Sequence, residues 1–325
     1  MKRLSLILLG ATAFFGAGCA PSFDPPSEVK SLRVLAVKKD KPYAQPGEEV
    51  TLSLLWHDPL GPRAVERLWL GGCTNPPADL YAGCFATLSE GFVPGSGDTF
   101  SLTIPDDVVL QRQPGQPSYG LSYVFFAVCA GTIELAPEQE GLPIRCVDDA
   151  GRPLGADDFV AGYTAIYSFD EFTNNNPKIT GFRFQGRDVT PDCTGVDCIG
   201  REIGDVDCSQ EAAPCVPACP DDGEPSCPEY EVMPVIDQAA SVEADEVSAA
   251  TYNADFQEQI WINYYVDSGT ISPAVKLVND ATKGWNPEQQ ADFRAAKDPG
   301  LAAVWAVVHD NRGGVEFARY TIKVE

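Results

Sequence analysis

The sequence contains few residues that could support nucleophilic catalysis. Its only two histidines, His57 and His309, each end an apolar run and precede an aspartate, Asp58 and Asp310. A His-Asp pair can activate a nucleophile. However, a strand that ends in a turn favours the same residue order, and the sequence has no Gly-x-Ser-x-Gly elbow. We therefore expect that this chain is not an enzyme.

Carboxylates are too abundant to identify a site by themselves. The 325 residues include 47 Asp and Glu against 23 Lys and Arg, which gives a formal net charge of −24. Such a charge repels phosphate backbones and argues against nucleic acid as a partner. Paired carboxylates also hydrolyse glycosidic bonds, but with so many candidate pairs no single pair is informative. A hydrolase with dispersed carboxylates is therefore kept as an alternative.

Cysteine gives a clearer signal. Of the eleven cysteines, Cys19 stands apart near the N-terminus, and the remaining even number suits disulfide bonds in an exported protein. We expect Cys73 to pair with Cys84 across a short loop, and Cys129 to pair with Cys146. The six cysteines between residues 193 and 227 allow 15 pairings, which spacing alone does not resolve. These six are Cys193, Cys198, Cys208, Cys215, Cys219 and Cys227.

The cysteine-rich stretch, residues 192–231, is also acidic and raises the question of a metal ion. Zinc is disfavoured because the stretch has no Cys-x-x-Cys spacing and no histidine. Calcium prefers several carboxylate oxygens, although the EF-hand spacing is absent. We expect no cofactor, with calcium as the alternative. The candidate calcium ligands are Asp205, Asp207, Asp221 and Asp222.

The N-terminal residues predict export and a lipid anchor. Lys2 and Arg3 precede an apolar run over residues 4–17, which is shorter than the roughly 20 residues that cross a bilayer. The motif Gly16-Ala17-Gly18-Cys19 resembles the lipobox of bacterial lipoproteins. This resemblance implies a signal peptide over residues 1–18 and acyl chains on Cys19, through which the protein would contact the membrane.

The residues after Cys19 indicate where the anchor would lie. Ala20 occupies the position at which an aspartate would retain a lipoprotein in the inner membrane, so the resemblance implies the outer membrane, on its periplasmic or cell-surface face. The prolines that follow predict an extended tether, with residues 19–30 forming the lipidated N-terminus and the tether.

The rest of the chain predicts β-strands, because short apolar or alternating runs are separated by Gly- and Pro-rich turns. An N-cap at Asn286 followed by Pro287 predicts one short helix over residues 287–297. The predicted fold class is all-β, with β-sandwiches over residues 31–172 and 177–325, the second carrying the disulfide-rich insertion 192–231. The expected strands cover residues 32–37, 50–56, 66–70, 123–128, 163–169, 179–184, 260–266, 274–278, 301–308 and 315–324.

Three segments resemble known proteins. The turn Gln45-Pro46-Gly47-Glu48 and its flanking strands resemble the opening of bacterial immunoglobulin-like domains. The C-terminal strand, Gly-rich turn and strand resemble the last strands of such domains or of polycystic-kidney-disease-type repeats. Residues 72–85 resemble a segment of uncharacterised lipoproteins of Gram-negative bacteria. These resemblances imply that the two predicted sandwiches are immunoglobulin-like domains of a lipoprotein, and they bring no known activity.

The aromatic residues could line a groove for a sugar or a peptide, although most are expected in the cores of the sandwiches. The candidate most expected to be exposed is Trp285, at the start of the predicted helix. We expect a non-enzymatic structural or interaction module of the cell envelope, whose partner is an unidentified envelope protein or glycan. The alternatives are a calcium- or glycan-binding surface adhesin and the envelope hydrolase. The other aromatic candidates are Trp56, Trp69, Tyr81, Phe85, Trp261, Tyr264 and Tyr265.

Overall fold

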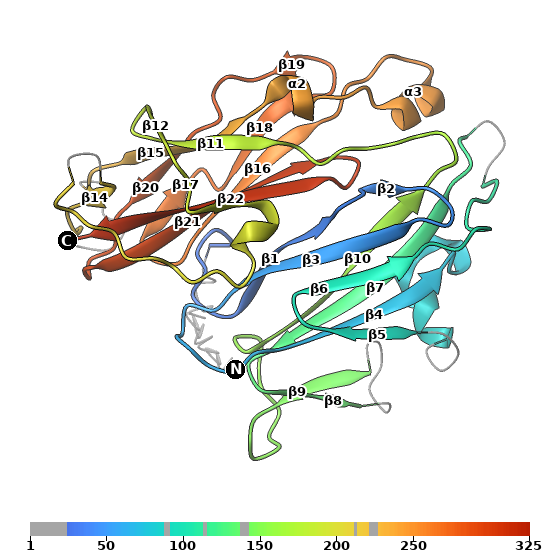
Figure 1. Ribbon diagram of the computed structural model, residues 1–325, viewed down its shortest axis with the longest axis horizontal. Helices are drawn as coiled ribbons and strands as arrows, with labels where there is room; N and C mark the ends of the chain where they lie inside the picture. Colours follow the sequence, from blue (N-terminus) through green and yellow to red (C-terminus); the bar gives the residue numbers. More distant parts are fainter. Residues whose placement is uncertain (1–24, 88–91, 113–115, 137–142, 211–212, 221–226) are drawn as a thin grey trace, which may run out of the picture.

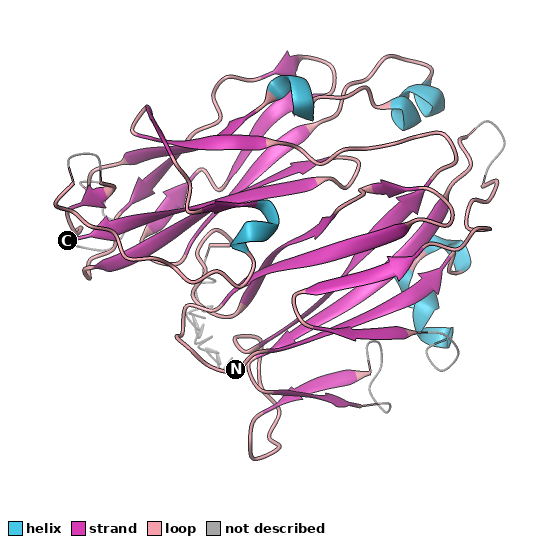
Figure 2. Cartoon of the chain, in the orientation of Figure 1, coloured by secondary structure: helices cyan, strands magenta, loops and turns pink. Residues whose placement is uncertain are grey.

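The computed structural model describes residues 25–325 apart from residues 88–91, 113–115, 137–142, 211–212 and 221–226 (Figure 1). In this part the chain consists mainly of strands, with a few short helical turns (Figure 2). No helix among the described residues is long and apolar enough to cross a membrane. The predicted signal peptide and Cys19 lie outside the described residues.

The first sandwich, residues 33–168, packs a three-stranded sheet against a five-stranded sheet. Its core contains Leu52 from the smaller sheet and Trp69 and Phe126 from the larger one. The smaller sheet has the order β1 (Arg33–Lys39), β3 (Glu49–His57), β6 (Thr99–Thr103). The larger sheet has the order β2 (Tyr43–Ala44), β10 (Phe159–Ser168), β7 (Gly120–Cys129), β4 (Glu66–Thr74), β5 (Val93–Ser96). The connections include the 3-10 helices η1 (Pro77–Asp79) and η2 (Tyr81–Thr87) and the hairpin of β8 (Thr132–Leu135) and β9 (Ile144–Val147).

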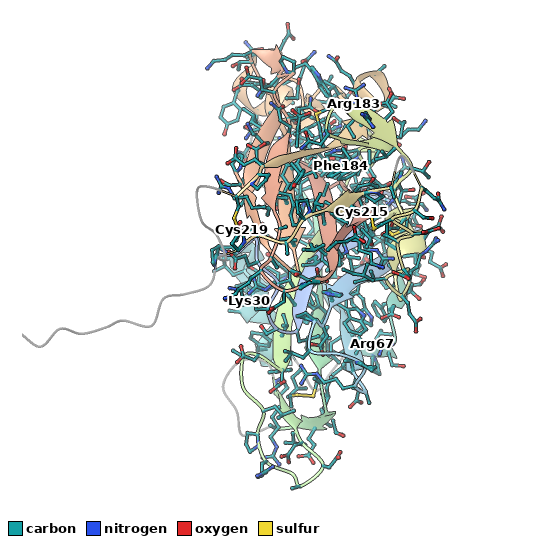
Figure 3. The ribbon with its side chains drawn as sticks, turned by 90° about the vertical axis from the view of Figure 1, so that its left-hand side faces the viewer. Lys30, Arg67, Arg183, Phe184, Cys215 and Cys219 are labelled. Carbon is teal, nitrogen blue, oxygen red and sulfur yellow. A yellow bond between two sulfur atoms is a disulfide. The ribbon has the colours of Figure 1, made fainter. Side chains whose placement is uncertain are left out.

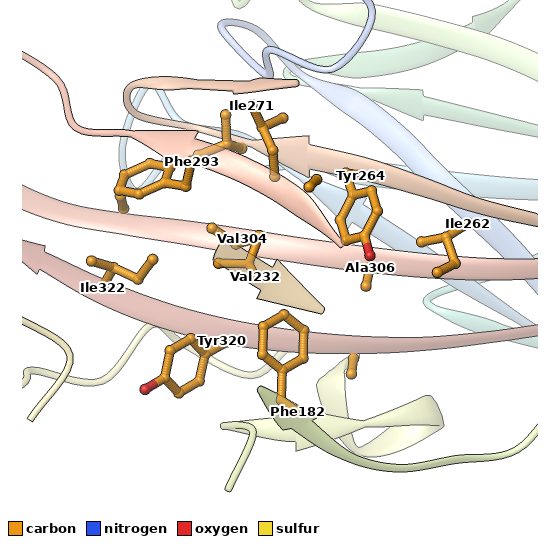
Figure 4. Packing of buried hydrophobic residues seen from close by; sticks show 14 of the residues in the cluster. Phe182, Val232, Ile262, Tyr264, Ile271, Phe293, Val304, Ala306, Tyr320 and Ile322 are labelled. Carbon is orange, nitrogen blue, oxygen red and sulfur yellow. The ribbon is translucent and has the colours of Figure 1, made fainter. Parts of the chain in front are cut away.

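The second sandwich, residues 179–324, also consists of two sheets, and Phe182, Phe293 and Tyr320 pack between them (Figure 4). One sheet has the order β12 (Arg187–Val189), β11 (Ile179–Phe184), β15 (Tyr230–Ile236), β20 (Ala291–Arg294), β17 (Thr270–Ser272). The other has the order β13 (Cys193–Thr194), β22 (Val315–Val324), β21 (Gly300–Asp310), β16 (Ile260–Val266), β18 (Val275–Asp280), β19 (Gly284–Trp285), with β14 (Cys215–Val216) also pairing with β22. The helical turns are η3 (Gly195–Cys198), α2 (Gln238–Ser241) and α3 (Glu246–Tyr252). The predicted all-β class with two sandwiches in tandem is confirmed.

Strand β21 joins the two sandwiches because both of its faces are buried. Val304 and its alternate neighbours point into the core of the second sandwich. Trp305 and Val307 point the other way and pack against Leu35 and Leu55 of the first sandwich. Figure 1 shows β1 and β3 lying beside β21 and β22. A strand that is buried on both faces has an almost continuous apolar sequence, as β21 does.

The segment before β1 also ties the sandwiches together, and this corrects the predicted tether. Ser27 and Val29 are buried, and the Val29 amide donates to the Val266 carbonyl oxygen at 2.8 Å. The Val266 amide in turn donates to the Ser27 carbonyl oxygen at 2.8 Å. The expectation that residues 19–30 are all extended tether is therefore wrong from Ser27 onward, because this segment pairs with β16 of the second sandwich.

The helix predicted over residues 287–297 is also wrong. Ala291, Phe293 and Ala295 are buried in the core, and this alternation with period two suits the strand β20 that the structure contains. The capping signal at Asn286 is real but serves a turn, in which its side chain accepts from the Glu288 amide at 3.1 Å. The short helices lie elsewhere, in α2 and α3.

The five disulfide bonds include both of the predicted pairs, Cys73–Cys84 and Cys129–Cys146. The second of these closes around the β8–β9 hairpin, which the sequence had not indicated as strands. The six clustered cysteines pair two by two in sequence order, the first with the second, the third with the fourth and the fifth with the sixth. These pairs are Cys193–Cys198, Cys208–Cys215 and Cys219–Cys227.

The cysteine-rich insertion is held by more than its disulfides. Arg319 of β22 is buried and donates to the carbonyl oxygens of Arg201 and Glu202, at 2.6 and 2.8 Å, while its Nε lies 3.2 Å from Asp192. Cys215 and Cys219 lie in the same half of the molecule as Phe184, whereas Arg67 lies in the half formed by the first sandwich (Figure 3). The insertion therefore packs along the second sandwich as part of its edge.

The shared junction makes a testable prediction for stability. Trp305 is 2% exposed, so Trp305→Ala should lower the free energy of unfolding by about 3–5 kcal/mol, through lost burial and the cavity left behind. Urea unfolding followed by circular dichroism would measure the loss. Val275→Ala, at a side chain that is 57% exposed, is the control and should change stability by less than about 0.5 kcal/mol. A Trp305→Ala loss as small as that of the control would contradict the role assigned to the junction.

Candidate functional site

Neither histidine pairs with the aspartate beside it. His57 Nε2 lies 3.0 Å from Oδ2 of Asp267 in the second sandwich, while Asp58 pairs with Arg63. His309 stacks on Trp261 at a ring-centroid distance of 5.3 Å. Successive residues of a strand point to opposite faces, which separates each histidine from the aspartate that follows it.

The calcium candidates are only partly described. Asp205 pairs with Lys323 at 3.0 Å, and the Asp207 side chain accepts from the Ser209 amide at 3.0 Å. Asp221 and Asp222 lie outside the described residues. Within the described part of the chain, no group of three or more His, Cys, Asp or Glu side chains is placed to hold a metal ion.

Trp285 does not stand free at a helix start. It lies in β19, is half-buried and packs against the core of the second sandwich. Of the other aromatic candidates, Trp69 and Tyr264 are buried in the two cores, and Trp261 lines a groove between the sandwiches. This groove, of about 650 Å³, is the candidate functional site, and we call it the interdomain groove.

One wall of the interdomain groove is aromatic and belongs mainly to the first sandwich. Tyr163 and Tyr167 project from β10, and Tyr43 and Tyr119 lie beside them. The ring of Tyr119 is 5.8 Å from that of Tyr167. Trp261 of β16 adds an aromatic ring from the second sandwich. A groove lined by flat rings suits a ligand with apolar faces.

The other wall is polar and is formed by the turn after β21 and the start of α3. Asp245 caps α3 by accepting from the Ser248 amide at 3.0 Å, and it also accepts from Nδ2 of Asn311 at 2.8 Å. The turn needs Gly313, whose φ is +91° and where a Cβ atom would lie 2.8 Å from Nζ of Lys39. The polar wall is therefore held in one arrangement by bonds within the protein.

Arg312 belongs to the same turn, lines the groove and connects the parts of the junction. It is 5% exposed, and its Nε and Nη2 donate to Glu258 and Glu243, both at 2.7 Å. Its Nη1 donates to the carbonyl oxygen of Thr173 in the segment between the sandwiches, at 3.2 Å. The guanidinium also lies over the ring of Tyr43 in the first sandwich, 5.6 Å from its centroid. One cation thus contacts both sandwiches and the segment that links them.

The linking segment, where the sequence predicted a domain boundary, is itself bonded on both sides. Asn176 donates to the Lys39 carbonyl oxygen at 2.7 Å and accepts from the Val315 amide at 2.8 Å. Asn174 is buried, and its Nδ2 lies 3.3 Å from a carboxylate oxygen of Asp310. The polar residues that mark the domain boundary in the sequence thus bond to both sandwiches.

Burial changes the pKa of several groups near the groove, among them Lys39, Glu258 and His309. It lowers the pKa of Lys39 to about 8, an effect that the carboxylate of Asp310 partly opposes. It raises the pKa of Glu258 to about 7, again with help from Asp310, while Arg312 acts in the opposite direction. It lowers the pKa of His309 to about 4. At neutral pH His309 is therefore uncharged, while Lys39 is mostly protonated and donates to the Ala165 carbonyl oxygen at 2.9 Å.

The sequence did not reveal most of this site. Trp261 was among the aromatic candidates, but Tyr163 and Tyr167 were seen only as part of a strand. Their spacing of four residues places them on the same face of β10. The hydroxyl groups on both rings were the one indication in the sequence that this face is turned toward solvent. Arg312, inside a predicted turn, gave no sign that it would be buried.

The buried ion pair of Arg312 and Glu258 leads to a prediction about stability. Arg312→Met would leave Glu258 buried without its cation and should lower the free energy of unfolding by about 3–5 kcal/mol. The double variant Arg312→Met/Glu258→Gln removes the unpaired charge and should recover at least about 1 kcal/mol of that loss. Chemical denaturation near neutral pH measures both. A double variant less stable than Arg312→Met would show that Glu258 is not an uncompensated charge in the single variant.

His309 makes a prediction about pH. Because its folded pKa is about 4 and its ordinary value is 6.5, the unfolded chain binds this proton more readily, so the stabilising contribution is present above pH 6.5 and is lost as the pH falls toward 4. His309→Phe should remove this dependence. The difference in unfolding free energy between wild type and variant should change by roughly 1–3 kcal/mol across that range.

The measurement must be this difference rather than the stability of the wild type alone. Glu258, with its raised pKa, makes the folded protein bind a proton more readily and lowers stability as the pH rises from 4.5 to about 7, which opposes His309. Denaturation curves of both proteins across the range separate the two contributions. A difference that does not vary with pH would contradict the buried, neutral state of His309.

Comparisons with known proteins give structural neighbours alone. No family model and no curated protein matches the sequence. The two tandem V-type regions of VCBP3, a v-region-containing chitin binding protein, match at 10% identity over 91% of this chain and all of that chain, with a TM-score of 0.24. The FN1–FN3 domains of chicken CNTN1 match at 9% identity over 92% of this chain and 68% of that chain, with a TM-score of 0.20. Escherichia coli alpha-2-macroglobulin activated by porcine elastase matches at 10% identity and a TM-score of 0.20, and the match covers 92% of this chain but 22% of the macroglobulin. The sheets show that this chain is a mostly β protein, and these matches are structural likenesses that assign it to no family.

Proposed function

We propose that this chain is a lipid-anchored lipoprotein of the bacterial outer membrane that acts as a non-enzymatic interaction module. The observation that carries the proposal is the interdomain groove, whose walls come from both sandwiches and are fixed relative to each other. A groove between rigidly joined domains suits recognition, because little conformational entropy is lost when a ligand binds.

The proposed location rests on the N-terminal sequence and on the cysteines. Lys2, Arg3 and the apolar run lead to Cys19 in a motif that resembles a lipobox. Ten other cysteines form five disulfide bonds, which persist in oxidising compartments such as the periplasm and the cell surface. Burial of several acyl chains, at about 0.8 kcal/mol per methylene group, would make release from the membrane negligible.

Cys19→Ala tests the anchor. The variant should lose fatty-acid labelling and move from the detergent phase to the aqueous phase in phase partitioning, because no acyl chain can be attached. Ala20→Asp is the matched control and should keep both the labelling and the detergent-phase behaviour. If Cys19→Ala partitions and labels like the wild type, the proposed location fails.

Crosslinking in intact cells tests the interaction itself. A photoreactive amino acid in place of Tyr163 should capture a molecule in the groove, whereas the same group in place of Val275 should not, because Val275 is exposed and lies outside the groove. Mass spectrometry of the adducts identifies the captured molecule. Equal adducts at both positions, or none at position 163, would contradict a groove-based interaction.

A further inference from the structure

Two tyrosines in the interdomain groove present their rings to solvent. Tyr163 is 47% exposed and Tyr167 is 41% exposed, although both come from the interior of the long strand β10. They are four residues apart on the same face, which separates them by about 13 Å along the strand. Ala165 lies between them, and its short side chain leaves the floor of the groove open between the two rings. The pair therefore forms two flat platforms along one line, farther apart than the width of a single sugar ring.

Neighbouring groups hold both rings in place. Tyr163 stacks on Tyr81 at a centroid distance of 4.4 Å, and Tyr81 belongs to the loop closed by Cys73–Cys84. Tyr167 packs against Tyr119, which has the Arg112 guanidinium over its ring, 4.8 Å from the centroid. Rings that are already ordered lose little entropy when a ligand packs on them, so the platforms are preorganised for binding.

The edge of β10 beside these rings is not open for a peptide strand. β10 pairs with β7 along its whole length, but on the other side it pairs with β2 only at Tyr167 and Ser168. An exposed edge of this kind can accept an added strand. Here the Lys39 ammonium donates to the Ala165 carbonyl oxygen at 2.9 Å and occupies the position that an incoming strand would need. The groove therefore favours a ligand that packs on rings over one that pairs with backbone.

The charge of the groove narrows the class of ligand further. Asp245 and Asp310 lie on the polar wall, and the whole chain carries a formal charge of −24. The cations near the groove are engaged, Lys39 by a carbonyl oxygen, Arg312 by two glutamates and Arg112 by Asp79. Polyanions would be repelled. The hydroxyl groups of Tyr163 and Tyr167 have no hydrogen-bond partner among the described residues, so both can bond to a ligand.

From these observations we infer that the interdomain groove binds a linear, uncharged oligosaccharide. The apolar C–H faces of its sugar rings pack on Tyr163 and Tyr167, and its hydroxyl groups bond to the tyrosine hydroxyls and to the polar wall. This inference rests on the proposed interaction function and specifies the ligand class of the same groove.

A glycan array tests the inference. The full chain, purified in detergent, is applied to an array that includes cellohexaose and maltohexaose as neutral probes and hexagalacturonate as an acidic one. We expect a neutral glycan to bind, and calorimetry with that glycan should show that Tyr163→Ala/Tyr167→Ala weakens the affinity at least about tenfold. Tyr163→Phe/Tyr167→Phe keeps the rings and should lose less affinity. Tyr252→Ala, at a tyrosine that is 71% exposed outside the groove, is the matched control and should leave the affinity unchanged.

Several outcomes would overturn the inference. These are the absence of any neutral glycan among the ligands, a preference for hexagalacturonate, and an affinity that the double alanine variant does not reduce while its melting temperature stays that of the wild type. If the photoreactive group at position 163 captures a protein and no glycan binds, the ligand class is wrong but the interaction function stands. If there is neither an adduct at position 163 nor a bound glycan, both proposals fail.

Discussion

The arrangement of the two sandwiches depends on the buried guanidinium of Arg312. Moving such a cation out of water is costly, and the structure compensates by bonding each of its three nitrogens. Glu243 and Glu258 belong, like Arg312, to the second sandwich, so the contacts that fix the relative orientation are those with Thr173 of the linking segment and with the Tyr43 ring of the first sandwich. A buried ion pair of this kind adds little to net stability, because the cost of removing both charges from water offsets their attraction.

Apolar packing supplies the stability that the ion pair does not. Strand β21 buries Val304 and Ala306 in its own sandwich and Trp305 and Val307 against the neighbouring one. This dual burial holds the two sandwiches together at the junction. The interdomain groove is the space left beside this packed region, so its shape follows from the same contacts.

The fold could be predicted from the sequence wherever one local pattern dominated. In β16 the alternation of Ile260, Ile262 and Tyr264 indicates a strand, and the structure has that strand over the predicted residues. In β20 the capping signal of Asn286 masked the weaker alternation around Phe293. The disulfides within short loops followed from spacing, whereas the pairing of the six clustered cysteines did not.

The groove could not be predicted in the same way, because its walls meet only in three dimensions. The glutamates that bind Arg312 lie 54 and 69 residues from it in the sequence, and Lys39 lies 126 residues from the carbonyl group that it caps. The local pattern of apolar and polar residues gives no information about contacts between residues so far apart in the sequence. Single residues gave hints, such as Trp261, but not the surface that they share.

The pairing of residues 27–29 with Val266 has a mechanical consequence for a chain held at Cys19. A force applied through the tether reaches the second sandwich at β16, a strand flanked on both sides within its sheet, before it can peel β1 from the edge of the first sandwich. A pulling force on the folded part of the chain would thereby be shared by both sandwiches and would not act on the edge strand β1 alone. Residues 27–29 would thus protect β1 from being pulled out of its sheet by a force on the proposed anchor.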